Sequence, residues 1–212
     1  MKLHVVDGSP SARRVQAVIN HLNLPVEYIV HDLFKGELRE AQYLELNANA
    51  LSPTLVDGTF VLWESIAIMQ YLADKAGDDK LFPRDPRTRA DVVRWQCWQL
   101  AHFNRAVGEI AFEIVAKGSR GIEPDAQRIS AASESLKRFA PVLDQHMANR
   151  QYLVGDHVTL ADYSTIVFEA YRPKLPFDWS PYPHLNAYFD RMHHAEAWVR
   201  AQASVAPTSR AA

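Results

Sequence analysis

The chain has 212 residues, of which 48% are hydrophobic, and its formal net charge at pH 7 is -2. This hydrophobic fraction is typical of a globular protein and excludes an intrinsically disordered one. A net charge so close to zero gives no general attraction to nucleic acid or to an anionic membrane, so we expect neither as a partner.

The cysteine, histidine and hydropathy patterns indicate which kinds of globular protein are excluded. The single cysteine, Cys97, excludes an intrachain disulfide, and its helical surroundings favour a buried small side chain over a catalytic thiol. No histidine and cysteine cluster has metal-ligand spacing, so we expect no metal. The start of the chain has no signal-peptide pattern, and no apolar run approaches the roughly 20 residues of a membrane span. We therefore expect a cytoplasmic protein.

The first part of the chain alternates predicted strands and helices. Leu3–Val6 is a short β-prone run, and Ala12–Leu22 has apolar residues on one helical face. Asn23-Leu24-Pro25 ends that helix, Val26–Val30 begins a second strand, and Glu37–Glu45 forms a short helix. A helical crossover between the first two strands makes them parallel.

A predicted hairpin and helix follow. Pro53 precedes the short strand Thr54–Val56, and Asp57-Gly58 is a strong turn signal before the returning strand Thr59–Trp63. The polar pair Glu64-Ser65 then opens a segment with apolar residues at helical spacing. Free backbone N–H groups at such a helix start suit the binding of a carboxylate.

The second part of the chain is predicted to be helical. Prolines and polar turn residues mark a linker near residues 78–86, and one long helix runs from Arg87 past Val107. Thr159 and Asp162 form a capping box that starts a later helix. The other predicted helices are Ala126–Met147, Pro183–Met192 and Ala195–Gln202.

Taken together and in this order, several motifs resemble the glutathione S-transferase superfamily, with a bacterial-type, Ser-type active site. The stretch Leu51–Leu72 matches the family's proline-led strand, DG turn, strand and ES pair. Ser9–Val15 matches its first loop and helix, and Gly155–Asp162 matches the capping motif of its second domain. Asp32–Glu37 and Leu46–Asn49 fill the middle.

The resemblance implies a two-domain fold. A thioredoxin-like α/β domain with the order βαβαββα would cover residues 1–77 and bind glutathione, and residues 78–86 would form the linker. An all-α helical bundle with the second-substrate pocket would cover residues 87–203, and residues 204–212 would form a flexible tail.

The resemblance also implies an activity. The protein would be a detoxification transferase, a homodimer that conjugates the glutathione thiolate to a hydrophobic electrophile. Because a fold does not fix a function, two alternatives stay open. One is a binding or regulatory protein with little catalysis, and the other is a glutathione-dependent isomerase or lyase with a narrow substrate.

Catalysis of this kind needs a thiolate, because the protonated thiol is a poor nucleophile. Lowering a thiol pKa from about 8.5 to roughly 6.5 takes about 2.7 kcal/mol of preferential stabilisation. Matching to Ser-type members selects Ser9 as the hydroxyl donor, with Ser11 second, while a helix cap is the plainer role for either. A tyrosine-type or cysteine-type mechanism is excluded, because His4, Val5 and Val6 occupy the strand and the loop contains no cysteine.

The binding positions also come from the resemblance. Glu64 and Ser65 would hold the γ-glutamyl group, Pro53 would be a cis-proline, and the backbone of Ser52 would pair with the glutathione cysteine. Lys35 would meet the glycyl carboxylate, unless it is a solvated surface lysine.

Other positions are less distinctive. The chain departs from the family pattern at Ser52, where Val or Ile is usual and backbone pairing tolerates the change, and at Leu38 and Leu51, where the resemblance implies polar contacts to glutathione that leucine cannot make. Arg13, Asp57 and Asp162 have structural roles at a helix start, a turn and a cap. Candidates for contact with the second substrate, or else for packing, are His102, Phe103, Asn104 and Phe112.

Overall fold

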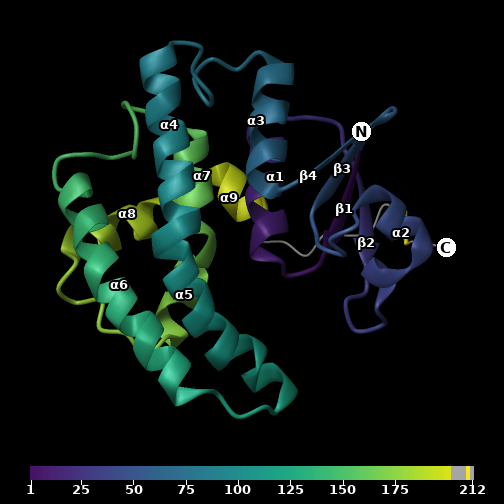
Figure 1. Cartoon of the computed structure of the whole chain (residues 1–212). Coiled ribbons are helices and arrows are strands. Elements are labelled where there is room, and N and C mark those ends of the chain that lie inside the picture. Colours follow the sequence, from purple (N-terminus) through teal and green to yellow (C-terminus); the bar gives the residue numbers. More distant parts are fainter. Residues whose placement is uncertain (202–208, 211–212) are drawn as a thin grey trace. The chain divides into compact units, whose positions relative to one another are not determined.

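The computed structural model describes residues 1–201 and 209–210, and it divides into two compact units (Figure 1). The first unit is Met1–Phe82 together with the chain from Ala195 onward, and the second is Pro83–His194. The division predicted from the sequence keeps the last helix with the second domain, whereas here that helix belongs to the first unit. The predicted flexible tail, 204–212, lies outside the described residues except for Ser209–Arg210.

The first unit has a mixed sheet, and the predicted order βαβαββα is confirmed. Its elements are β1 (Lys2–Val6), α1 (Pro10–Leu22), β2 (Glu27–His31), the 3₁₀ turn η1 (Glu37–Arg39), α2 (Ala41–Leu46), β3 (Thr54–Asp57), β4 (Phe60–Trp63) and α3 (Ser65–Ala76). The strands lie in the order β4-β3-β1-β2-β5, where the two-residue β5 (Ser209–Arg210) was not expected. β1 and β2 are parallel, as predicted, and β3 is antiparallel to both β1 and β4.

The core of the first unit lies where the sheet meets α1 and α3. Leu3 and Val5 on β1 and Val15 on α1 are fully buried. The last helix, α9 (Glu196–Arg200), packs on α1, where the Arg13 guanidinium carbon lies 3.9 Å from the centre of the Trp198 ring. This contact adds a cation–π attraction to the packing of the two helices.

The hairpin forms where the turn signal predicts it. Asp57 pairs with Phe60, and Gly58 between them has a φ of +62°, a conformation that glycine adopts without strain. The Asp57 carboxylate accepts a 2.6 Å hydrogen bond from the Tyr71 hydroxyl and pairs with Lys75. These two residues on α3 lower the pKa of Asp57 and attach the hairpin to that helix.

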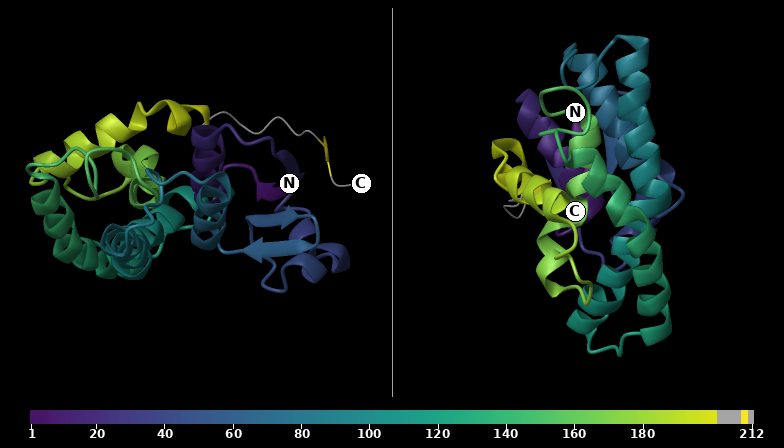
Figure 2. Two further views of the ribbon diagram at one scale, coloured as in Figure 1. Left: turned by 90° about the horizontal axis from the view of Figure 1, so that it is seen from above. Right: turned by 90° about the vertical axis from the view of Figure 1, so that its left-hand side faces the viewer.

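The second unit is built from helices. They are α4 (Pro86–Trp98), α5 (Asn104–Ala111), α6 (Ala126–Met147), α7 (Leu160–Thr165) and α8 (Pro183–His193), with 3₁₀ turns at η4 (Gly118–Arg120) and η5 (Ile166–Lys174). α4 begins after Asp85, whose carboxylate accepts the Thr88 N–H at 2.9 Å. α5 and α6 lie side by side in both views of Figure 2 and are in contact.

The predicted single long helix contains two π-helical turns. These are η2 (Gln99–Phe103) and η3 (Phe112–Ala116), before and after α5. Buried polar groups explain the first one. The Asn104 amide nitrogen donates to the Ser164 carbonyl at 3.0 Å and also to the Gln99 side chain. The wider π-helical turn allows the buried amide side chains to form hydrogen bonds. A sequence repeat of apolar residues does not predict these hydrogen bonds, so the π-helical turn was not expected.

Cys97 is exposed on α4, so the prediction of a buried cysteine was wrong. The buried face of this helix contains Val92, Trp95 and Gln96. Cys97 is five residues after Val92, which turns its side chain away from that face.

The predicted capping box at the start of α7 is confirmed. The Asp162 carboxylate accepts the Thr159 N–H at 2.8 Å, the Leu153 N–H at 2.9 Å and the Tyr188 hydroxyl at 3.1 Å. Burial raises the pKa of Asp162 to about 6, although these hydrogen bonds favour its charged form. Asp162 therefore connects three parts of the second unit.

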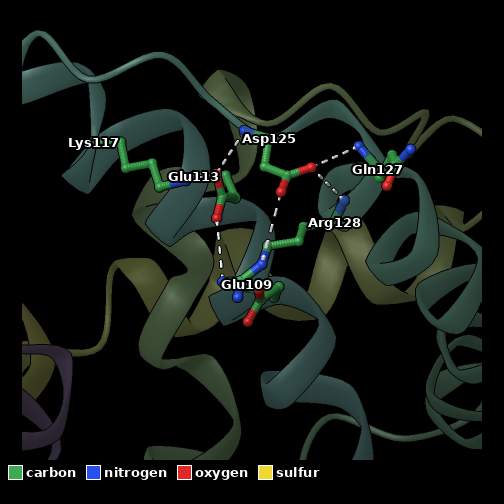
Figure 3. A network of polar contacts seen from close by, with 6 residues as sticks. All are labelled: Glu109, Glu113, Lys117, Asp125, Gln127 and Arg128. Carbon is green, nitrogen blue, oxygen red and sulfur yellow. Dashed lines mark hydrogen bonds and ion pairs between the residues drawn. The ribbon is translucent and has the colours of Figure 1, made fainter.

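A second polar network links η3 to the start of α6 (Figure 3). Glu113 has no exposed surface, and its carboxylate accepts from Lys117 Nζ at 2.5 Å and from the Asp125 N–H at 2.7 Å. Arg128 Nη1 lies 3.6 Å from the other Glu113 oxygen. Lys117 is the main cause of the lowered pKa of Glu113.

No helix among the described residues is both long and apolar enough to span a bilayer. The same part of the chain contains no group of three histidine, cysteine, aspartate or glutamate side chains that could hold a metal ion.

Candidate active site

Ser9 caps the helix that follows the first strand. Its hydroxyl oxygen accepts the Ala12 N–H at 3.3 Å, and its own N–H donates to the Val6 carbonyl at 3.2 Å. Pro10 takes the first helical position, where its missing N–H does no harm. Ser9 and Ser11 are both half-buried.

Ser52 and Pro53 lie beside the same end of β1. Their peptide bond is cis, as the resemblance implied. The Ser52 hydroxyl oxygen accepts the Val6 N–H at 3.0 Å. Val6 thus binds the Ser9 loop through its carbonyl and the Ser52 side chain through its N–H. The backbone of this one residue therefore brings together Ser9 and Ser52, which are more than 40 positions apart in the sequence.

Glu64 and Ser65 form the start of α3. Glu64 is exposed and has a φ of +72°, an unfavourable conformation for a residue with a side chain. Ser65 is buried and is the first residue of the helix. The N–H groups of the first turn have no carbonyl partner within the helix and carry partial positive charge. The turn can therefore accept a carboxylate.

Arg14 is a further candidate for the site, which the sequence motifs did not indicate. It is on α1, which packs on α3, and its side chain is only 4% exposed. Its Nε and Nη1 atoms have no hydrogen-bond partner among the described residues. Burial lowers the pKa of Arg14 to about 10, and the charge of Glu64 opposes that change. The available signal was its spacing, because Arg14 is four residues before Val18 on the buried face.

Lys35 lies at the surface of the loop after β2. Its side chain is 71% exposed, and its Nζ is 3.8 Å from the Asp32 carboxylate. The two leucines that depart from the family pattern differ in burial, because Leu38 is 4% exposed and Leu51 is 62% exposed. Leu38 belongs to the core, whereas the Leu51 side chain lies in solvent.

The candidates for the second substrate lie in the second unit. The ring of His102 is exposed and stacks on Phe139, with ring centres 4.7 Å apart. Phe103 is buried and stacks on Trp98, so it packs in the helical core. Asn104 is also buried, while Phe112 is 45% exposed.

The class of protein follows from comparison with known proteins. Residues 8–75 match the family model of the glutathione S-transferase N-terminal domain, and residues 100–196 match that of the C-terminal domain. The chain is 31% identical to glutathione S-transferase 3 of Zea mays, over 97% of this chain and 94% of that protein. It therefore belongs to the glutathione S-transferase family.

Solved structures agree with this assignment. The crystal structure of glutathione transferase F7 from Populus trichocarpa superposes with a TM-score of 0.88 at 26% identity, covering 94% of this chain and 96% of that one. A glutathione transferase homologue from Lodderomyces elongisporus, solved with two GSH per subunit, gives 0.82 at 25% identity, with 95% and 96% covered.

Proposed function

We propose that the first unit binds glutathione and that the protein conjugates the glutathione thiolate to a hydrophobic electrophile in the cytoplasm. Family membership supports the transferase class. The observation that carries the site assignment is the backbone of Val6, whose carbonyl binds the Ser9 loop and whose N–H binds Ser52. A tripeptide paired with the backbone of Ser52 would then have its sulfur near the Ser9 hydroxyl.

Ser9 is the proposed thiolate donor, with Ser11 as the second candidate. Its hydroxyl proton is free to point at the sulfur, because the oxygen acts as an acceptor toward Ala12. A hydroxyl can donate one hydrogen bond while it accepts another. Helix N-terminal N–H groups add to the stabilisation of the thiolate. The thiol proton is released to solvent, and the thiolate sulfur then forms a bond to the electrophilic carbon. In the same reaction the carbon loses halide from an aryl halide, its C–O bond in an epoxide, or the π pair of an enone, and a proton from solvent neutralises the oxyanion or carbanion that forms.

The γ-glutamyl end of the ligand is assigned to the start of α3. The ligand carboxylate would bind Ser65 and the N–H groups of the first turn, and its ammonium would meet Glu64. Arg14 adds a buried positive charge close enough to act on Glu64. Lys35, exposed on its loop, is the proposed partner of the glycyl carboxylate.

The second substrate and the oligomer are further parts of the proposal. We assign the electrophile to a surface of the second unit that includes His102, since Phe103 is enclosed in the core. The protein is proposed to be a homodimer. In support, the edge strand β4 exposes two aromatic side chains, Phe60 at 46% and Trp63 at 45%, and unpaired sheet edges with apolar side chains favour association.

A glutathione-binding protein with little catalysis is the second candidate. The observation that favours it is the loss of polar contacts, because Leu38 is buried and the Leu51 side chain lies in solvent. Fewer contacts lower affinity without changing the fold.

Binding and turnover separate the two candidates. We expect glutathione to bind the purified protein in titration calorimetry, and a panel of aryl halides, epoxides and enones to include at least one that is conjugated. Binding without conjugation of any member would favour the second candidate. Absence of glutathione binding would contradict both.

A further inference from the structure

Two histidines from neighbouring strands lie against each other in the first unit. His4 Nδ1 and His31 Nε2 are 2.9 Å apart, and the rings stack with centres separated by 5.2 Å. Burial, helped by the charge of His31, lowers the pKa of His4 to about 4. Burial also lowers the pKa of His31, although Glu37 and Glu40 oppose that change. Both rings are therefore neutral at pH 7, and one donates a hydrogen bond to the other.

Glu37 determines which ring is the donor. His31 Nδ1 is buried, lacks a hydrogen-bond partner among the described residues and lies 4.0 Å from the Glu37 carboxylate. A proton on this nitrogen faces a negative charge, whereas a lone pair there would be repelled. His31 then has its lone pair on Nε2, so it accepts the hydrogen bond from His4 Nδ1–H.

The histidine pair packs against the ring of Tyr43 on α2. The Tyr43 ring meets both imidazoles edge-on, with its centre 4.8 Å from that of His31 and 5.9 Å from that of His4. Tyr43 is 3% exposed. Its ring position is thus fixed by contacts on β1 and β2.

The Tyr43 hydroxyl reaches both sides of the Ser52–Pro53 peptide. It donates to the Leu51 carbonyl at 2.6 Å and lies 2.9 Å from the Thr54 hydroxyl. Asn47 makes parallel contacts, because its amide nitrogen donates to the same carbonyl at 2.9 Å. Leu51 and Thr54 directly flank the residues assigned to pair with glutathione.

We propose that Tyr43 is a positioning residue for glutathione, which holds the Leu51 carbonyl before Ser52–Pro53 and the Thr54 side chain after it, while the His4–His31 pair holds its ring. This inference rests on the proposed function. A peptide that pairs with backbone groups binds tightly only if those groups are already ordered, because ordering them on binding reduces the affinity. The Tyr43 hydroxyl does this work without touching the ligand.

The pair also makes binding sensitive to acid. The hydrogen bond between the two rings survives the addition of one proton, because a protonated imidazole still donates to a neutral one. A second proton breaks it, because His4 Nδ1 and His31 Nε2 then both have a hydrogen and no lone pair accepts. The charged groups around the pair are Lys2 on β1, Glu27 on β2, Glu37 on η1 and Glu40 before α2. Because burial lowers the pKa of both rings and only the second proton disrupts the pair, glutathione affinity should stay level from pH 7.5 to about 5 and fall as the pH approaches 4, the pKa of His4.

Tyr43→Phe tests the hydroxyl and keeps the ring. We expect the glutathione Kd at pH 7.5 to rise about fivefold to tenfold, the effect of one lost hydrogen bond, while kcat at saturating glutathione stays within about twofold. Tyr71→Phe is the matched control, because it removes a bonded hydroxyl from the same unit, at the hairpin. Its Kd should not change. An unchanged Kd in Tyr43→Phe, with only a lower melting temperature, would overturn the proposal.

His4→Phe tests the histidine pair separately. The wild-type Kd should stay constant between pH 7.5 and 5 and weaken about twofold or more between pH 5 and 4, and His4→Phe should remove most of that dependence. His184→Phe, at an exposed position on α8, should retain it. A pH dependence in His4→Phe equal to that of the wild type would contradict the role of the pair. A wild-type protein that binds no glutathione at any pH would instead refute the proposed function itself.

Discussion

Replacing Ser9 separates two roles of one hydroxyl. As a helix cap it accepts the Ala12 N–H at 3.3 Å, and its loss to alanine should lower the free energy of unfolding by about 1 kcal/mol. As a thiolate donor it would contribute a charge-assisted hydrogen bond of about 1.5–3 kcal/mol. Its removal should then raise the pKa of bound glutathione by about 1 to 2 units, because each unit corresponds to about 1.4 kcal/mol.

Glycine distinguishes the two roles, since it is a good cap without a hydroxyl. Ser9→Gly should lower the unfolding free energy by only a few tenths of a kcal/mol, while raising the thiol pKa as much as Ser9→Ala does. The thiol pKa is read from the ultraviolet absorbance of the thiolate and from kcat/KM against pH. Ser11→Ala is the control. The assignment fails if Ser11→Ala shifts the thiol pKa and the two Ser9 variants do not.

Three further outcomes follow from local geometry. Glu64→Gly should raise the unfolding free energy by about 1 kcal/mol, because glycine adopts the φ of +72° at this position without strain. The same variant should weaken glutathione binding at least about tenfold. An unchanged glutathione affinity would show that Glu64 is not part of the site. Asp162→Ala should lower the unfolding free energy, measured by urea titration, by about 3 kcal/mol, because it removes the helix cap and leaves the Leu153 N–H unpaired. Asp156→Ala, at an exposed position, is the control and should change the unfolding free energy by less than about 0.5 kcal/mol. Because the pKa of Asp162 is raised to about 6, the folded state binds this proton more tightly than the unfolded state, so its contribution to stability is greatest below about pH 4 and is lost as the pH rises through 6. The difference between wild type and Asp162→Asn should follow that curve, and a flat difference would show that the carboxyl does not titrate in this range.

Much of the fold was predictable because its signals are local. Asp57-Gly58 specifies a two-residue turn, Thr159 and Asp162 specify a cap, and alternating strands and helices specify a parallel pair. The turn and the cap depend on neighbours within a few positions, and the parallel pair depends on three consecutive elements, β1, α1 and β2. The structure has all three features where they were predicted.

The missed features depend on contacts between distant residues. The π-helical turn at Gln99 arises from a partner on α7, and the pairing of His4 with His31 depends on strand register. For the site, matching motifs selected Ser9, Ser52 and Glu64, but no motif showed that Val6 links two of them. The burial of Arg14 could have been predicted, because its spacing from Val18 places it on the buried face of α1.

The docking of α9 on α1 has a practical consequence for dissecting the protein. The first unit is formed by two segments that are far apart in the sequence, Met1–Phe82 and the chain from Ala195 onward. The second segment is held on α1, because the Asn20 side chain donates to the Ala197 carbonyl at 3.3 Å and Trp198 is fully buried. A truncation after Phe82 would leave the apolar surface of α1 open to water. A minimal glutathione-binding fragment is better made by fusing residues 195–201 to the first segment through a short linker, or by circular permutation.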